Sequence, residues 1–200
     1  MYIPESGTKL VYEYHVASKT LCQHSVQVPW AFTSCFAFVQ TPVDCRLFIT
    51  GGVGGDEETY KRCIEIIPGS DEQPWTHSLK ESMHSKRIDH SLCCLDSKYL
   101  FVTGSYIQHE QMSESCERYD IELDRWAKFP SLSRGRAFHS SCGYEGRFIY
   151  VFCGLAIERS LLEVKSEQDH GQTIIKEELH WRVTSTIECL DTHNKNAGWK

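Results

Sequence analysis

Residues Arg136–Gly154 read RAFHSSCGYEGRFIYVFCG, and this layout recurs along the chain. It occurs 49 residues earlier as RIDHSLCCLDSKYLFVTGS, Arg87–Ser105, and in a weaker form before that as CFAFVQTPVDCRLFITGG, Cys35–Gly52. Each copy holds two β-prone runs around a turn and ends in small residues that include glycine. Because a segment that returns at a near-fixed period is one structural unit used repeatedly, the sequence predicts a repeat protein.

Two further short runs complete each unit. In the second copy they are Ser115–Ile121, SCERYDI, and Arg125–Leu132, RWAKFPSL; in the first copy they are Arg62–Pro68 and Trp75–Met83. These runs are rich in residues that favour strands, and helical periodicity is nearly absent from the chain. We therefore expect an all-β protein with four short strands in each unit, preceded by an N-terminal strand within Gly7–Leu21.

The third copy carries an insertion. Gly154 to Leu190 spans 36 residues, whereas the matching segment of the second copy, Ser105 to Tyr119, spans 14. The 22 additional residues lie between the second and third strands of the unit, within residues 155–186, and include the one segment with helical character, Ile174–Trp181. An insertion confined to one loop of one repeat is typical of a surface loop, often on the binding face.

Composition limits the classes of partner. The 200 residues suffice for one domain, and the net charge of −6 comes with scattered Lys and Arg rather than a basic stripe, so we expect no nucleic-acid binding. The longest apolar runs, such as Phe148–Phe152, are far too short to cross a bilayer, and no secretory signal is visible. We therefore expect a cytoplasmic protein whose ten cysteines are reduced thiols.

Four-stranded units of about 50 residues, with a glycine pair after the second strand and a Tyr-to-Trp spacing across the last two, resemble kelch repeats. The resemblance covers about residues 7–200. The second copy matches best; the positions that carry the resemblance are Thr103–Ser105, Tyr119 and Trp126 in that copy, Gly51-Gly52 and Trp75 in the first, and Cys153-Gly154 and Trp199 in the third. The resemblance implies a β-propeller in which each repeat is one four-stranded antiparallel blade.

The number of blades is too small for a closed ring. The chain supplies about three to three and a half blades, whereas propellers close with about four to eight. We expect one kelch-repeat domain over residues 1–200 that forms an open arc, and open blade edges could allow self-association. Its predicted parts are a partial blade at 1–30, blades at 31–83 and 84–132, and a blade at 133–200 with an inserted loop near 155–186 and a truncated last strand.

An Arg-x-x-His pattern opens two of the blades, as Arg87 with His90 and Arg136 with His139. In the kelch family an arginine at the matching position often points into the mouth of the propeller, and in some members it binds acidic peptides. A guanidinium can hold a carboxylate through two parallel hydrogen bonds. These four residues are therefore the candidates for binding a protein partner through an acidic segment, although the first copy has Ala31 instead of arginine.

The same residues have a structural alternative. The two arginines could bond to loop carbonyls and hold adjacent blades together, and the histidines, which begin apolar strands, could be hydrogen-bonded within the protein. Beside the arginines, the loop Gly51–Tyr60 and the insertion Leu155–Val183 are the further contact candidates.

No signature of catalysis is visible. The glycine run Gly51–Gly55 lacks the Lys-Ser/Thr pair of a phosphate loop, and no nucleophile motif occurs. Near His84 and His90, the adjacent Cys93 and Cys94 should point to opposite faces of a strand and so should not hold one metal ion. We expect no catalytic residue, no metal and no cofactor, and hence a non-enzymatic protein-interaction scaffold that binds through the loop face of the propeller. The alternatives are the substrate-recognition part of a ubiquitin ligase adaptor and a propeller-based oxidoreductase.

Overall fold

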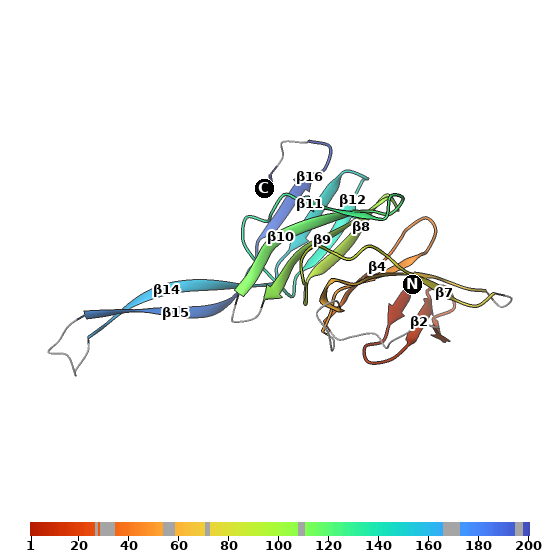
Figure 1. Ribbon diagram of the computed structural model, residues 1–200, viewed down its shortest axis with the longest axis horizontal. Helices are drawn as coiled ribbons and strands as arrows, with labels where there is room; N and C mark the ends of the chain where they lie inside the picture. The colour runs from red at the N-terminus through yellow and green to blue at the C-terminus, as the bar shows by residue number, and fades with distance from the viewer. Residues whose placement is uncertain are drawn as a thin grey trace.

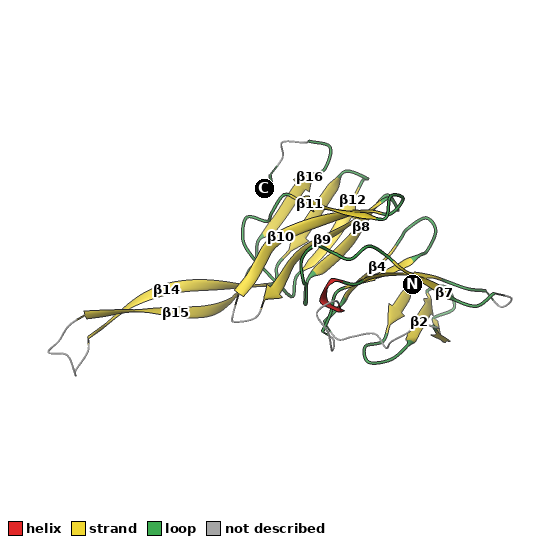
Figure 2. Ribbon diagram, in the orientation of Figure 1, coloured by secondary structure: helices red, strands yellow, loops and turns green. Residues whose placement is uncertain are grey.

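The chain was analysed as a computed structural model, which describes residues 1–26, 28, 35–53, 59–70, 73–107, 111–165, 173–194 and 198–200. It is built from antiparallel β-sheets (Figures 1 and 2). Among the described residues the one helical turn is the 3-10 segment η1, Thr59–Lys61. Nothing helical in those ranges has the length and apolar character that crossing a membrane requires.

Four sheets follow one another along the chain, and a two-stranded ribbon projects from the last of them (Figure 1). Sheet N contains β1 (Tyr2–Pro4), β2 (Leu10–His15) and β3 (Thr20–Ser25). Blade 1 contains β4 (Ala37–Gln40), β5 (Leu47–Thr50), β6 (Cys63–Ile67) and β7 (Thr76–Leu79). Blade 2 contains β8 (Ser91–Leu95), β9 (Tyr99–Ile107), β10 (Gln111–Asp120) and β11 (Arg125–Phe129). Blade 3 contains β12 (Ser140–Tyr144), β13 (Phe148–Phe152) and β16 (Ile187–Asp191), and the ribbon, here called the arm, contains β14 (Leu155–Lys165) and β15 (Thr173–Val183).

The prediction of an all-β chain of four-stranded antiparallel blades in an open arrangement is confirmed. Blades 1 and 2 each have four strands paired in sequence order. Blade 3 has three strands, and the backbone of Lys200 exchanges hydrogen bonds of 2.9 and 3.0 Å with Cys189 of β16. The blades follow the chain as an arc rather than a ring (Figure 1).

Two local predictions were wrong, those for Ile174–Trp181 and for Trp75. Ile174–Trp181 is not helical but lies within β15, because eleven consecutive residues there pair with β14. The strand expected within Gly7–Leu21 is β2, which a turn separates from β3, and sheet N has three strands. Trp75 is not the equivalent of Trp126. Ile66 of blade 1 takes the place of Tyr119 of blade 2, and the residue across from Ile66 is His77, whereas the residue across from Tyr119 is Trp126.

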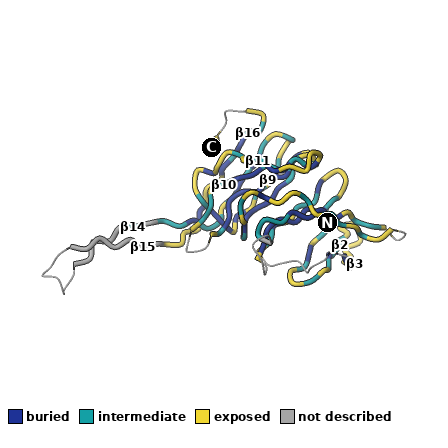
Figure 3. Tube along the Cα trace, viewed as in Figure 1, coloured by how far each residue is buried: buried dark blue, intermediate teal, exposed yellow. Residues whose placement is uncertain are grey.

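The cores lie between successive sheets, and the second strands of blades 1 and 2, β5 and β9, are buried on both faces (Figure 3). Alternate side chains of a strand point to opposite faces, so β5 contributes to two cores. Leu47 and Ile49 pack with Val11 of sheet N, whereas Phe48 packs toward blade 2, where its ring lies 6.3 Å from that of Tyr119. Each large apolar side chain buried between two sheets stabilises the fold by about 1.5–3 kcal/mol. Because several are buried in each such layer, the stacking of blades is the main source of stability.

Candidate functional site

Successive blades meet at a repeated contact, here called the joint. In the first joint the Nε2 atom of His90 is hydrogen-bonded to Thr50 Oγ1 at 2.8 Å, and the Gly52 amide donates to the carbonyl of Arg87 at 3.1 Å. Thr50 ends a strand of blade 1, whereas Arg87 and His90 open blade 2. The joint therefore ties the end of one blade's second strand to the beginning of the next blade.

The second joint repeats the first between blades 2 and 3. His139 Nε2 is hydrogen-bonded to Thr103 Oγ1 at 2.8 Å, and the Ser105 amide donates to the carbonyl of Arg136 at 3.1 Å. Gly104, with φ of 60°, lies between these contacts, and a Cβ added to it would stand 2.3 Å from that carbonyl oxygen. The glycine is therefore required by both its conformation and the approach of the next blade.

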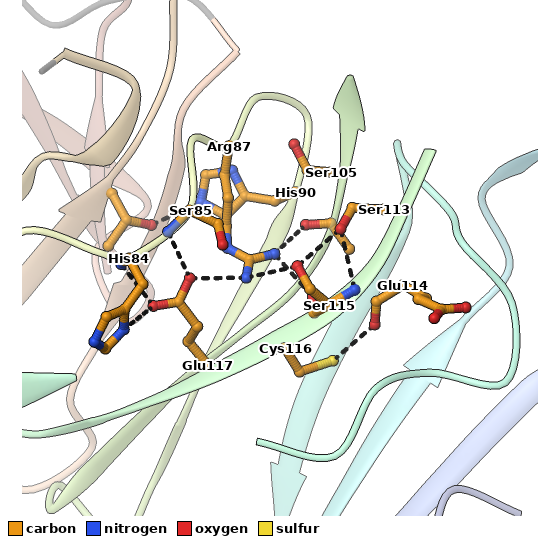
Figure 4. Close-up of polar contacts among 12 residues, drawn as sticks. His84, Ser85, Arg87, His90, Ser105, Ser113, Glu114, Ser115, Cys116 and Glu117 are labelled. Atoms are coloured by element: carbon orange, nitrogen blue, oxygen red, sulfur yellow. Dashed lines mark hydrogen bonds and ion pairs between the residues drawn. The ribbon is translucent and has the colours of Figure 1, made fainter. Parts of the chain in front are cut away.

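The Arg87 side chain is fully buried in blade 2 (Figure 4). Its Nη1 donates to the carbonyls of Gly104 and Ser115, both at 2.8 Å, and its Nη2 donates to Ser115 Oγ at 3.0 Å and to Glu117 Oε1 at 2.9 Å. The guanidinium is thus directed at two strands of its own blade and not at solvent.

Arg136 has the same surroundings in blade 3. It is 1% exposed and donates to the carbonyl of Cys153 at 3.0 Å, to Thr186 Oγ1 at 3.1 Å and to the carboxylate of Glu188. Glu188 also accepts the backbone amide of Ser133 at 2.7 Å. Each blade that has the arginine therefore contains a buried Arg–Glu pair surrounded by hydrogen bonds.

The glutamate of the blade 2 pair, Glu117, is held ionised. Burial by itself would raise the pKa of Glu117, but the charge of Arg87 and the hydrogen bonds from Arg87 and His84 bring that pKa below its ordinary value. Its carboxylate accepts the backbone amides of His84 at 2.8 Å and Ser85 at 3.1 Å. A buried charge with this many donors is compensated, whereas the same charge with its cation removed would not be.

Blade 1 lacks both members of the pair. Ile64 lies across from Ile49 as Glu117 lies across from Val102, so a buried isoleucine occupies the glutamate position. Ala37 lies across from Thr50 as Ser91 lies across from Thr103, so the arginine position of blade 1 is residue 33, a threonine, and the expected match with Ala31 was wrong. That position is outside the described residues. Within this chain, the two blades that have the arginine also have the glutamate, and blade 1 has neither.

Both joint histidines are buried in their uncharged form. Burial, followed by the charge of Arg136, lowers the pKa of His139 to about 4, and burial with the charge of Arg87 lowers that of His90 well below 6.5. A neutral imidazole can donate through one ring nitrogen and accept through the other. These histidines therefore act as hydrogen-bonding groups between blades at neutral pH.

The depressed pKa of His139 predicts a loss of stability on mild acidification. The unfolded chain takes up a proton near pH 6.5 and the folded chain only near pH 4, so the stabilisation is present above pH 6.5 and is lost as the pH falls toward 4. Between pH 7 and pH 5 we expect a loss of about 2 kcal/mol from this residue. Urea unfolding at the two pH values measures it.

The non-titrating variant His139→Gln isolates this contribution. It should show a smaller difference between pH 7 and pH 5, while His90 and the carboxylates remain unchanged. A pH dependence parallel to that of the wild type would contradict the assignment.

Exposed and half-buried residues gather where the joints reach the surface. Asp89 donates its amide to the carbonyl of Cys35 at 3.0 Å, and Phe138 donates its amide to the carbonyl of Asp89 at 2.8 Å, so one residue per blade is linked to the next. All three have positive φ, and Phe138 is 54% exposed. Ile88 bridges to Tyr106, so these segments lie beside the loops that follow the second strand of each blade.

The base of the arm lies in the same place. Leu155, at the beginning of β14, bridges to Ala137, directly beside Phe138. Trp181 of β15 stacks on Tyr106 of blade 2 with ring centroids 5.8 Å apart, and it remains 44% exposed. The arm is thus attached to two blades at its base and extends away from them (Figure 1). We call this surface, made of Asp89, Phe138, Tyr106, Trp181 and the arm, the loop face.

The structure places the predicted contact residues in two different locations. Arg87, Arg136, His90 and His139 are brought together in the joints, but beneath the loop face rather than on it. The insertion lies on that face, and of the loop Gly51–Tyr60 the stretch 54–58 is outside the described residues. Sequence reasoning missed Phe138 and Asp89, although their place between Arg and His in each Arg-x-x-His pattern is a signal that could have found them.

Comparison with known proteins gives one curated relative and several solved structures. No family model matches the chain. A RING finger domain and kelch repeat-containing protein of Dictyostelium discoideum is 26% identical over 137 residues, which are 67% of this chain and 13% of that protein. The structure of YjhT superposes with a TM-score of 0.59 at 11% identity over 87% of this chain and 52% of that one. The fold is that of a kelch-type β-propeller.

A copper-bound fungal alcohol oxidase of the AA5 family shares this kelch-type fold. It superposes with a TM-score of 0.58 at 13% identity over 76% of this chain and 33% of that one. At this identity the likeness concerns the fold and not the chemistry. The chain spans about an eighth of the length of its curated kelch relative, so it corresponds to a part of that protein.

Proposed function

We propose that this chain is a non-enzymatic interaction module of the cytoplasm that binds another protein through its loop face. The observation that carries the proposal is the arm, which among the described residues only blade 3 has and which begins beside the exposed Phe138. Exposed aromatic side chains beside an inserted loop are typical of protein-binding surfaces, because aromatic residues contribute most to binding energy there. The kelch-repeat relative supports a protein partner in general.

In this proposal the four joint residues act by position rather than by contact. An acidic segment of a partner would have to displace Glu117 or Glu188 to reach the guanidinium of Arg87 or Arg136, at the cost of leaving a buried carboxylate unpaired. We propose that Arg87, Arg136, His90 and His139 hold the loops of the binding face at fixed positions.

The proposal is tested by affinity capture from cytosolic extract with matched variants. Phe138→Ser removes an exposed aromatic from the loop face, and we expect it to weaken capture of the specific partner at least about tenfold, as for a binding hot spot. A second variant, in which residues 159–179 are replaced by a short glycine-serine turn, should weaken capture to a similar degree. Quantitative mass spectrometry of the captured proteins measures both.

The control is Val43→Ser. Val43 is 80% exposed and lies in the turn between β4 and β5, at the opposite end of a blade from the loop that follows β5. Unchanged capture by both loop-face variants, or an equal loss with Val43→Ser, would contradict the loop-face proposal.

A second candidate function is substrate recognition for a ubiquitin ligase. The observation that favours it is the curated relative, whose name combines kelch repeats with a RING finger domain. If this function is correct, the partner captured by the loop face should be ubiquitylated less in cells that lack the protein.

Self-association through the open edges of sheet N and blade 3 would appear as a solution mass twice that of the 23.0 kDa chain.

A further inference from the structure

Blade 3 has an aromatic face that points away from blade 2. Ile149 of β13 is buried against blade 2, so its neighbours Phe148 and Tyr150, and Phe152 two residues further on, lie on the opposite face. The ring of Tyr150 is central: it lies 6.2 Å from that of Phe152 and 6.4 Å from those of Phe148 and Tyr144. Tyr144 is 53% exposed and the other three are half-buried. This aromatic face has the composition of a core layer without being buried as one.

The repeat shows what a residue in the place of Tyr150 packs against. Tyr150, Phe101 and Phe48 hold the same position in blades 3, 2 and 1, because each lies across from the third residue of its blade's first strand. Phe101 is 1% exposed and packs against blade 3, and Phe48 is fully buried and packs against blade 2. Among the described residues, no sheet follows blade 3 to cover Tyr150 in the same way.

Phe48 packs against an aromatic pair of blade 2. Tyr119 lies across from Trp126, seven residues further along the chain. The ring of Tyr119 is 6.3 Å from that of Phe48 and 4.9 Å from that of Trp126, and both members of the pair are at most 3% exposed. The core between two blades therefore joins one face of the first blade to the opposite face of the next.

Sheet N has the counterpart of that pair, and it lies at the surface. Tyr14 lies across from Leu21, seven residues further along, as Tyr119 lies across from Trp126. Val11 of the same strand is buried against blade 1, and Tyr14, an odd number of residues away, lies on the opposite face. Leu21 is 59% exposed and Tyr14 is half-buried. The two ends of the arc thus present the two halves of a blade-to-blade contact.

We propose that a second copy of this chain covers both ends, with blade 3 of each copy packed against sheet N of the other. Tyr150 of one copy then meets Tyr14 and Leu21 of the other, as Phe48 meets blade 2 within the chain. This head-to-tail contact is favoured over a face-to-face contact because the described blades join unlike faces. The contact specifies the self-association raised above, and it does not depend on partner binding at the loop face.

The size of the arc agrees with a ring of two copies. Each copy supplies four sheets apart from the arm, and two copies supply eight, within the range of about four to eight in which propellers close. The chain also superposes on 52% of YjhT, so one copy corresponds to about half of that chain. A head-to-tail contact gives a ring when its rotation closes, and two arcs that each turn through half a circle meet this condition.

This association should depend on apolar burial. Phe152 takes the position of Thr103, so the hydrogen bond of the joint has no counterpart at the contact between copies. Burial of aromatic rings is then the main contribution to binding. We therefore expect a reversible dimer that is in equilibrium with the monomer at low protein concentration.

Sedimentation equilibrium of the whole, reduced chain over a range of concentrations measures the association. We expect the wild type to approach twice 23.0 kDa. Leu21→Glu on sheet N and Tyr150→Glu on blade 3 should each raise the dissociation constant at least about tenfold, because a charge is then placed within an apolar contact. Tyr144→Glu, at a 53% exposed position of the same aromatic face, repeats the blade 3 test without altering a half-buried residue.

Mixing the two variants tests the arrangement of the copies. In a head-to-tail ring the mixture retains one unaltered contact, between blade 3 of Leu21→Glu and sheet N of Tyr150→Glu. The mixture should therefore form heterodimers at concentrations where each variant alone is monomeric. In a face-to-face dimer through blade 3, Leu21→Glu alone would still associate as the wild type does, and that result would overturn the head-to-tail arrangement.

The matched control is Leu123→Glu. Leu123 is 70% exposed in the turn between β10 and β11, and its replacement should leave the association unchanged. Phe138→Ser should also leave it unchanged, so that failure of this proposal and failure of the loop-face proposal can be told apart. A wild type that stays monomeric at every concentration would overturn the second copy as the occupant, and masses beyond the dimer would overturn the closed ring.

Discussion

Replacing Arg87 with methionine should lower the free energy of unfolding by about 3–5 kcal/mol, the usual cost of removing one partner of a buried ion pair. The guanidinium contributes four hydrogen bonds within blade 2, two of them to the carbonyls of Gly104 and Ser115. Without it, the carboxylate of Glu117 stays buried with its charge opposed only by the amides of the 84–85 segment and the His84 ring. Urea or thermal unfolding measures the loss.

Blade 1 indicates how the loss can be recovered. Since Ile64 occupies the glutamate position there, the double variant Arg87→Met/Glu117→Ile should be more stable than Arg87→Met alone, because no charge is left unpaired. The control is Arg134→Ala: Arg134 is 45% exposed and pairs with Glu158 at the surface, so its loss should cost less than about 1 kcal/mol. A double variant no more stable than the single one would contradict the ion-pair account.

Gly104→Ala should destabilise the chain by about 2–5 kcal/mol. The left-handed conformation at φ of 60° costs an alanine about 1–2 kcal/mol, and forcing atoms into a filled space typically costs about 1–3 kcal/mol more. The new Cβ would stand 2.3 Å from the carbonyl oxygen of Arg136 and 2.7 Å from the ring of His139. Blade 3 would therefore have to move away from blade 2, which thermal unfolding should report.

Gly7→Ala separates the two parts of that cost. Gly7 also has positive φ, 78°, but nothing lies within 4 Å of the position that its Cβ would take. Its replacement should cost about 1–2 kcal/mol, from backbone conformation alone. Equal losses in the Gly7 and Gly104 variants would show that the close approach of the next blade contributes nothing.

The third blade departs from the joint of the other two. Phe152 and Cys153 stand where blade 2 has Thr103 and Gly104, and Cys153 keeps the positive φ, 56°, despite its side chain. Phe152 cannot hydrogen-bond to a histidine, and a Cβ already occupies the glycine position. The contact that links blades 1 to 2 and 2 to 3 is therefore not available in the same form on the outer side of blade 3.

Much of the fold could be predicted from residue types and spacing. Antiparallel blades are indicated by the period of about 50 residues, the strand-forming runs and the glycines after the second strands. The alternation of apolar and polar residues with period two marks a strand in any fold. The insertion was visible from the interval between Gly154 and Leu190. Its conformation was not, because a segment with mixed polarity becomes a strand or a helix according to what it pairs with, and Ile174–Trp181 pairs with β14.

The sequence by itself determined that this chain is a repeat of β-blades and that one of the repeats carries an added segment. The tertiary structure alone decided what Arg87 and Arg136 do. Their carboxylate partners lie 30 and 52 residues further along the chain. A spacing pattern indicates that such residues recur, but only the distance between folded strands shows which groups meet and which are left at the surface.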